Sequence, residues 1–306
     1  AQMIRFHYLA GYDYIPGAFT LGGRGALEPG EEARIVRELR ADRAARRQLT
    51  RAESAPGEIR TLDDFHAYPW PPLAGPVDLS WFERLPAQLP PGMKAIAWTN
   101  GIYETVSQLM GYERFCYALY DDPELVQRLF ETVGALKVDR FARLARLDVV
   151  GALWLADDLG YTEGLLWSAD AMRRYLFPWY RELGHIARRH DKPLILHSDG
   201  RLWPILDDLL DAGYHALQPV EPKAWSPHEL RARYGSRLAI GGTIDVDLLT
   251  RGTPAQVDAL VKEHIETLGA RGGFCVGTSN TPAYYISIDN LRAMLAAAVR
   301  NGAQVR

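Results

Sequence analysis

KPLILHSDG, residues 192–200, is a run of leucine and isoleucine that ends abruptly in His-Ser-Asp-Gly. A short apolar run of this kind is typical of a buried strand. Because side chains alternate along a strand, Ile195, His197 and Asp199 share one face. The stretch therefore predicts a buried strand that presents an imidazole and a carboxylate at its carboxyl end.

The same pattern returns several times after Lys94, as apolar strands that end in polar or glycine residues and precede helices. These segments are residues 94–101, 152–160, 215–222, 237–245 and 273–280. Ser226-Pro227 and Thr253-Pro254 mark helix starts between them, and Asp122-Pro123 opens a long amphipathic helix. Apolar strands that alternate with helices predict a parallel sheet covered by helices.

Such a sheet either stays open and doubly wound or closes into a barrel of eight strands. No glycine-rich phosphate-binding motif follows an early strand, which removes the best support for an open nucleotide-binding sheet. Polar residues at the carboxyl end of strand after strand are typical of barrel enzymes. We therefore predict an α/β fold, a TIM-type (β/α)8 barrel.

Residues 1–93 lack this regularity. They include a charge-dense helix expected over residues 31–48 and clustered prolines in residues 67–76 and 85–92. We expect an irregular N-terminal extension or lid, packed on a barrel body that spans residues 94–306. The whole chain would form a single structural domain.

Composition narrows the function. The net charge of −3 over 306 residues shows no basic excess, so nucleic acid is not the expected partner. No apolar run approaches the ~20 residues of a membrane span, and the first residues do not read as a secretory signal. Two distant cysteines, Cys116 and Cys275, fit a reducing compartment. We expect a cytoplasmic protein, a monomer or homodimer, that acts on a small molecule.

The candidate catalytic residues are His197, Asp199, Asp157 and Asp158. An H-x-D pair at a strand end can hold a divalent metal ion, or it can be a general base with its orienting carboxylate. The alternative is a histidine bonded to loop backbone and an aspartate that caps the next helix. Of Asp157 and Asp158, alternation allows only one to face the pocket, and the sequence does not say which.

Further polar and aromatic residues near strand ends are candidates for substrate binding, against the alternatives of packing, capping or solvation. They are Trp98, Asn100, Tyr161, Glu221, Asp245 and Asn280. Gly241-Gly242 indicates either close approach of a ligand or neighbouring backbone, or a plain bulge.

The order of several blocks resembles the uroporphyrinogen decarboxylase superfamily, which includes cobalamin-linked thiol methyltransferases. The blocks are GIYETVSQLMGYERFCYALYDDPELV, LADDLGYTEGLLWSADAMRRYLFPWY, LILHSDG, ALQPVEP, AIGGTIDV and GGFCVGTSN. The resemblance covers roughly residues 94–300 and implies a barrel with its site at the strand ends.

This chain departs from the decarboxylases of that group at two motifs. They carry an arginine-rich RQAGR motif near the N terminus, where this chain has GYDYIPGAFTLGGRG with Arg24 alone. They also carry a histidine in a GHG turn after the last strand, where this chain has Thr278-Ser279-Asn280. A tetra-acidic porphyrinogen is therefore a poor fit, although Asp157 and Asp199-Gly200 have counterparts in some decarboxylases.

The zinc methyltransferases of the group hold their metal with H-x-C and a distant cysteine. By that resemblance His197 matches the histidine, Asp199 replaces the first cysteine, and Ser279 or Asn280 stands near the second. A carboxylate in place of a thiolate makes a harder site, better suited to oxygen-donor substrates.

We therefore predict a metal-assisted methyltransferase or demethylase that acts on a small O- or N-methyl substrate together with a corrinoid protein. His197, Asp199 and Glu221 would hold a divalent ion, with zinc as the favoured metal, and the partner protein would supply the corrinoid. The first alternative is a decarboxylase, a lyase that needs no cofactor and in which His197 handles the proton. The second is a non-catalytic ligand-binding barrel.

Overall fold

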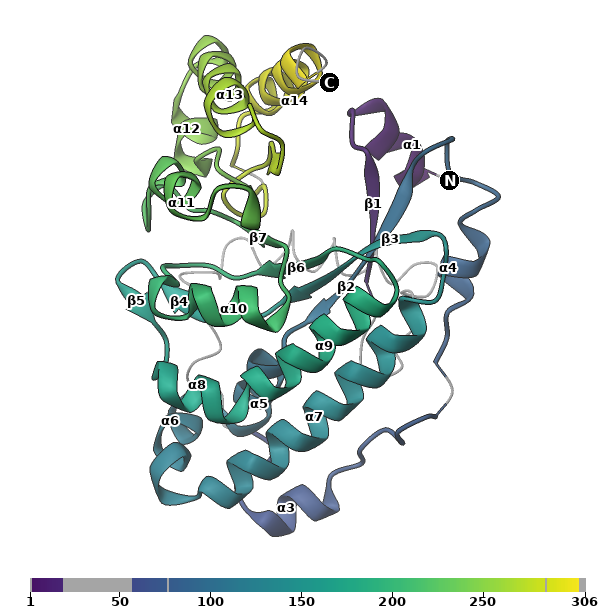
Figure 1. The fold of residues 1–306 in the computed structure, drawn as a ribbon, viewed down its shortest axis with the longest axis vertical. Coiled ribbons are helices and arrows are strands. Elements are labelled where there is room, and N and C mark those ends of the chain that lie inside the picture. Colours follow the sequence, from purple (N-terminus) through teal and green to yellow (C-terminus); the bar gives the residue numbers. More distant parts are fainter. Residues whose placement is uncertain (1, 19–56, 76, 284, 303–306) are drawn as a thin grey trace.

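The computed structural model describes residues 2–18, 57–75, 77–283 and 285–302. In this part of the chain, parallel strands form one curled sheet whose spatial order follows the chain order (Figure 1). Its strands are β1 (Tyr14–Ala18), β2 (Lys94–Asn100), β3 (Val150–Ala156), β6 (Leu194–His197), β7 (Ala216–Gln218), β8 (Ala239–Gly241) and β9 (Phe274–Cys275). A short antiparallel pair, β4 (Gly160–Tyr161) and β5 (Gly164–Leu165), follows β3.

Helices connect the strands and cover the outer face of the sheet. They are α1 (Gln2–Leu9), α3 (Leu62–Ala67), α4 (Ser80–Arg84), α5 (Ile102–Met110), α6 (Tyr112–Asp121), α7 (Pro123–Leu144), α8 (Ala169–Tyr175), α9 (Phe177–Arg189), α10 (Leu206–Ala212), α11 (Pro227–Tyr234), α12 (Val246–Arg251), α13 (Pro254–Leu268) and α14 (Ile288–Gly302). In Figure 1, α7, α9 and α10 lie side by side along one side of the sheet, and α13 packs on α14.

The predicted helix signals act as expected. The side chain of Asp122 accepts a hydrogen bond from the backbone N–H of Leu125 at the start of α7. Thr253 forms a capping box at the start of α13. Near Pro178 the helical path is interrupted, because α8 ends before Leu176 and α9 begins after it.

All the predicted strands are present, and β1 adds one that the sequence analysis placed in the N-terminal extension. Residues 14–18 pair with β2 in parallel, so this part of the extension belongs to the sheet itself. The helix expected over residues 31–48 lies outside the described residues. Within the described residues, no helix is long and apolar enough to cross a lipid bilayer.

The sheet curls until its first and last strands approach each other. A Cβ atom on Gly11, just before β1, would lie 2.6 Å from Cγ2 of Val299 in α14. Burial raises the pKa of Tyr14 on β1 to about 12, and the thiol of Cys275 on β9 adds to that rise. The described residues contain seven strands of the sheet and no ladder between β1 and β9, so the predicted closed barrel of eight strands is seen as a curled sheet. Pro16 cannot donate to a ladder, and β9 has only two residues.

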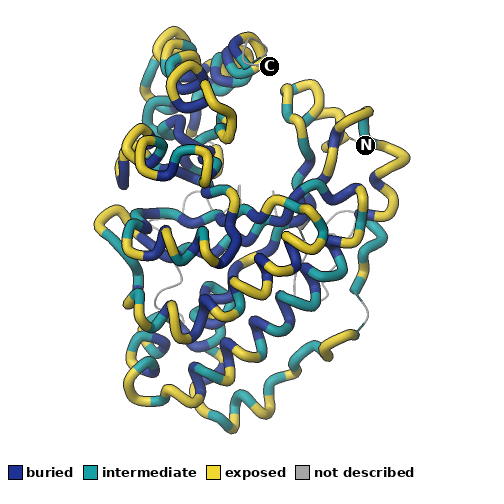
Figure 2. Tube along the Cα trace, viewed as in Figure 1, coloured by how far each residue is buried: buried dark blue, intermediate teal, exposed yellow. Residues whose placement is uncertain are grey.

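The two faces of the sheet differ in burial. Leu153, Leu155, Leu194 and Leu196 point toward the helices and belong to the main apolar core. Figure 2 shows this core as the buried inner sides of the helices against the strands. The alternating residues on the inner face are partly exposed, among them Trp154. The curled sheet therefore has a packed outer face and an inner face that solvent reaches.

Candidate metal and substrate site

The site lies on the inner face, where residues of neighbouring strands stand in register. One layer contains Trp98, Trp154, Ile195, Ala216 and Ala239. The next layer, toward the carboxyl ends of the strands, contains Asn100, Ala156, His197, Gln218, Gly241 and Cys275. The polar side chains therefore lie one layer above a layer that we call the floor. The floor has aromatic side chains on β2 and β3 and alanines on β7 and β8.

Asp157 is fully buried behind the sheet, at the start of α5. Its carboxylate accepts hydrogen bonds from the backbone N–H groups of Ile102, Tyr103 and Glu104 at 2.9, 3.0 and 2.8 Å, and from the hydroxyl of Tyr180 at 2.8 Å. Burial raises the pKa of Asp157 to about 6, although these hydrogen bonds act to lower it. The residue thus caps the positive end of a helix and ties it to β3.

Gly101 makes that capping contact sterically allowed. A Cβ atom at this position would lie 1.9 Å from Cγ of Asp157. Only glycine lets the buried carboxylate come so close to the start of α5. The Asn-Gly sequence that ends β2 is therefore explained by packing.

Asp158 points to the other side of the strand and meets His197. Its Oδ1 atom lies 3.8 Å from Nε2 of His197 and accepts a hydrogen bond of 3.0 Å from the backbone N–H of Asp199. Nε2 of His197 is in turn 4.0 Å from Oδ1 of Asp199. These three residues offer ligand atoms within 4.8 Å of one another, and we call them the Asp-His-Asp triad.

His197 is held by a residue on the neighbouring strand. Its Nδ1 atom lies 2.6 Å from Oε1 of Gln218. Because an amide oxygen can only accept, Nδ1 carries a proton in this contact, and Nε2 is the nitrogen that faces the carboxylates. Nε2 is the nitrogen that a metal ion would use.

Asp199 is oriented by Asn280, which follows β9. The side-chain nitrogen of Asn280 donates to Oδ2 of Asp199 at 3.0 Å. Burial, followed by the charges of Asp158 and Glu221, raises the pKa of Asp199 to about 6, and His197 and Asn280 oppose that rise. Oδ1 of Asp199 is buried and has no hydrogen-bond partner in the described part of the chain.

The donor set fits a divalent ion. With bonds of about 2.1 Å in a tetrahedral arrangement, ligand atoms lie about 3.4 Å apart, so the separations of 3.8 and 4.0 Å would have to close by about 0.5 Å around the ion. One imidazole nitrogen and two carboxylate oxygens suit ions such as zinc or manganese. The buried, unpartnered Oδ1 of Asp199 is the atom that such an ion would satisfy.

Glu221 lies beside the triad and outside it. Its Oε2 atom accepts a hydrogen bond of 2.8 Å from the backbone N–H of Gly200. The sequence analysis placed Glu221 among the metal ligands, whereas the structure groups Asp158 with His197 and Asp199. Glu221 is therefore a neighbouring charge in this arrangement.

The remaining candidates have separate environments. Asp245 caps α12, as its side chain accepts from the backbone N–H of Asp247. Tyr161 is half-exposed, and its carbonyl accepts from the backbone N–H of Arg201. Trp98 and Asn100 lie on β2 in the two inner layers, one above the other.

Two residues of the inner face were not singled out from the sequence. Gln218 holds His197, and the ring of Trp154 lies 6.4 Å from the ring of His197 between centroids. The signal for Trp154 was the alternation that also places Ala156 and Asp158 on its face. Gln218 is found only through the pairing of β6 with β7, which is a tertiary relationship.

Comparison with known proteins gives the family. The model of the uroporphyrinogen decarboxylase (URO-D) family matches residues 54–301. The chain belongs to the URO-D family. The expected family is confirmed, and the curled parallel sheet is consistent with the barrel that the family resemblance implies. No curated protein matches this URO-D family chain.

Among solved structures, a methyltransferase from Methanosarcina mazei has a similar fold. The TM-score is 0.59 at 19% sequence identity, and the match covers 72% of this chain and 62% of that one. The aligned part of this URO-D family chain therefore spans less than two thirds of the methyltransferase. At this identity the likeness concerns the fold.

Proposed function

We propose that this URO-D family protein is a metal-assisted methyltransferase or demethylase that acts on a small O- or N-methyl substrate. The observation that supports this proposal is the convergence of Nε2 of His197 with Oδ1 of Asp158 and Oδ1 of Asp199. A corrinoid protein would be the methyl acceptor. The fold likeness to a methyltransferase adds support.

The triad would hold the divalent ion, for which zinc is our first candidate. Such an ion supplies Lewis acidity toward an oxygen or nitrogen of the substrate. The chain's own residues prepare the site: Gln218 fixes the tautomer of His197, and Asn280 fixes the carboxylate of Asp199. Asp158 accepts a hydrogen bond from the backbone N–H of Asp199, and this contact fixes the two aspartates relative to each other.

The transfer balances as a displacement at the methyl carbon. The bond from the methyl carbon to oxygen or nitrogen breaks, and its electron pair stays on that atom. A corrinoid protein acting as methyl acceptor would have to supply the electron pair of the new bond from its reduced cofactor. An oxygen leaving group then takes up a proton, whereas a trialkylamine leaving from a quaternary ammonium departs neutral.

A second function is supported by the pKa of Asp199. Its rise to about 6 leaves about one carboxyl in ten protonated at pH 7 in the metal-free protein, so Asp199 could hand a proton to a carbanion after loss of carbon dioxide. Family membership is compatible with such a decarboxylase. This function needs no metal ion.

Metal titration separates the two functions. Calorimetric titration of zinc and manganese into metal-free protein should give one stoichiometric site, which His197→Ala and Asp158→Ala both abolish. Asp245→Ala is the matched control, because Asp245 is also a strand-end acid but caps α12. If the wild-type protein binds neither ion, the metal-assisted proposal is wrong and the decarboxylase becomes the leading function.

A further inference from the structure

The floor beneath the Asp-His-Asp triad has two unlike halves. Trp98 and Trp154 stand in register on the adjacent strands β2 and β3, and both are partly exposed on the inner face. Adjacent strands are about 4.8 Å apart, so the two indoles start side by side from neighbouring strands, and we call this pair the aromatic wall. The ring of Trp154 is tilted by 32° to the ring of His197, at 6.4 Å between centroids.

The other half of the floor is built from small residues. Ala216 and Ala239 continue the layer of the tryptophans on β7 and β8. In the layer above, a Cβ atom on Gly241 would meet Cβ of Cys275 at 3.3 Å and Cγ of Gln218 at 3.8 Å. A side chain at position 241 would therefore crowd Cys275, so the room on this part of the inner face comes from the small, partly exposed side chains of Ala216 and Ala239.

The charge beside this space is negative. A divalent ion would balance the carboxylates of its two ligands, Asp158 and Asp199, and Glu221 would remain. Among the described residues, the recorded contact of the Glu221 carboxylate is with the backbone N–H of Gly200, a neutral donor. Glu221 also acts on Asp199 by charge, so it lies close to the triad. A partly buried carboxylate of this kind favours a cation as its neighbour.

We propose that the space beside the triad binds a methylated ammonium group. This inference rests on the proposed function and names its substrate class. The methyl groups would lie against Trp98 and Trp154, since tryptophan faces attract quaternary ammonium ions. The positive charge would balance Glu221, and the small residues at 216 and 239 give the group its room. A neutral aryl methyl ether could use the same wall, but it would leave Glu221 unbalanced.

The test compares two probes of equal shape. Choline carries a trimethylammonium group, and 3,3-dimethylbutan-1-ol is its uncharged counterpart. Binding is measured by calorimetry and tryptophan fluorescence on the full chain, with and without zinc. Choline should bind at least about tenfold tighter than the alcohol. Equal binding of the two, or tighter binding of anisole than of choline, would overturn the proposal.

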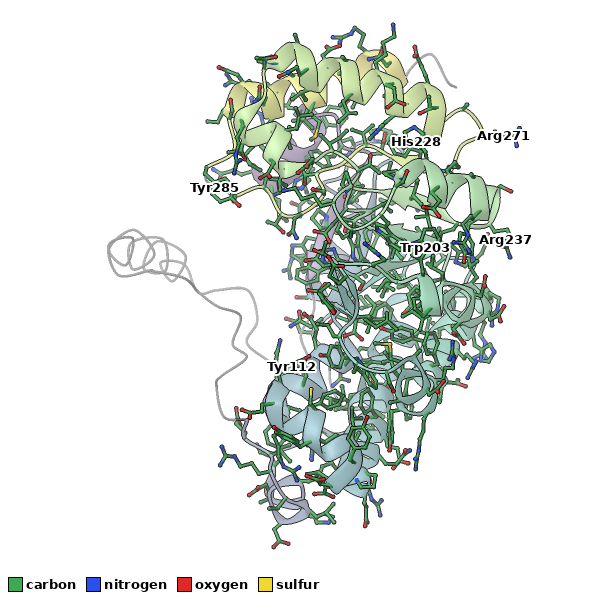
Figure 3. All side chains as sticks on the ribbon, turned by 90° about the vertical axis from the view of Figure 1, so that its left-hand side faces the viewer. Tyr112, Trp203, His228, Arg237, Arg271 and Tyr285 are labelled. Atoms are coloured by element: carbon green, nitrogen blue, oxygen red, sulfur yellow. The ribbon has the colours of Figure 1, made fainter. Side chains whose placement is uncertain are left out.

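Matched variants locate the site. Trp154→Leu and Glu221→Gln should each weaken choline binding several-fold, and Trp154→Phe should keep part of it because a ring remains. Trp203→Leu is the control, as Trp203 lies beside Arg237 on the side of the molecule opposite Tyr285 (Figure 3). If Trp154→Leu is folded by circular dichroism and binds choline like the wild type, the inference is wrong.

Failure of this inference can be told apart from failure of the proposed function. Zinc titration of the wild type and of Trp154→Leu reports on the triad alone. If the protein binds zinc stoichiometrically but does not prefer choline to the alcohol, the proposed substrate class is wrong and the metal site is supported. If the protein prefers choline but binds no zinc, the metal-assisted function is wrong and the ammonium site is supported.

Discussion

Asp157 and Asp158 are adjacent in the chain, yet their carboxylates lie on opposite sides of the strand that they end. Asp157 is fully buried and caps α5 through three backbone N–H groups. Asp158 lies 3.8 Å from Nε2 of His197 on the inner face. Two identical side chains thereby have different surroundings: Asp157 stabilises the start of α5, and Asp158 belongs to the triad.

Replacement of each aspartate by asparagine should separate these roles. Asp157→Asn should lower the free energy of unfolding by about 3 kcal/mol, because an amide nitrogen would face buried N–H donors. Asp158→Asn should change stability little and should weaken zinc binding. Urea denaturation and zinc titration of both proteins check this, and a stable Asp157→Asn with weak zinc binding would reverse our assignment.

Gln218 should control metal affinity without touching the ion. Gln218→Leu removes the acceptor at Nδ1 of His197, and zinc affinity should fall about 10- to 100-fold. Gln218→Glu keeps an acceptor at the same place and should restore the affinity. Calorimetry on the two variants is the measurement, and equal affinities for zinc would show that Gln218 does not hold His197 in solution.

Gly200 should be far less tolerant of alanine than Gly164. The φ angle of Gly200 is +81°, and a Cβ atom there would lie 2.2 Å from the backbone nitrogen of Tyr161. Gly200→Ala should therefore cost at least about 2 kcal/mol of unfolding free energy. A Cβ atom on Gly164 would meet nothing within 4 Å, so Gly164→Ala should stay within about 0.5 kcal/mol of the wild type in denaturant titrations.

Lys137 should give the stability a distinctive dependence on pH. It is buried in α7 and donates to the hydroxyl of Thr99 at 3.1 Å. Burial lowers the pKa of Lys137 to about 8 from 10.5, against the opposing charges of Asp157 and Glu104. The unfolded chain therefore binds more protons between pH 8 and 10.5, and stability should rise with pH across that window.

The comparison of two methionine variants isolates this contribution. Lys137→Met should lose the rise in stability between pH 8 and 10.5 that Lys137 contributes. Lys94→Met, which changes an exposed lysine on β2, should keep that rise. The free energy of unfolding is measured at pH 7.5, 9 and 10.5 for the three proteins. If the free energy of unfolding changes with pH equally in Lys137→Met and in the wild type, the lowered pKa of Lys137 is contradicted.

Sequence patterns located the strands because each is an apolar run that ends in polar residues. They did not find β1, where Tyr14, Pro16 and Gly17 break the apolar run, so the segment was assigned to the extension. Its place in the sheet comes from pairing with β2, which no local pattern encodes.

The part of the site that lies on a single strand was predictable from the sequence. His197 and Asp199 share a face of β6 and its extension, and alternation predicts that directly. The choice between Asp157 and Asp158 was open because both directly follow the end of β3, and the hydrogen bonds of α5 decide which one turns outward. Glu221 was expected as a ligand because it ends a strand, but its bond to Gly200 holds it beside the triad.

The bond between Asn280 and Asp199 joins residues that are 81 positions apart. During translation, the segment that carries Asp158, His197 and Asp199 leaves the ribosome well before Asn280 is added to the chain. A growing chain therefore has the three side chains of the triad before it has the amide that orients Asp199. An ion captured at that stage would be held more loosely than by the finished protein, so metal loading is expected to follow release of the chain.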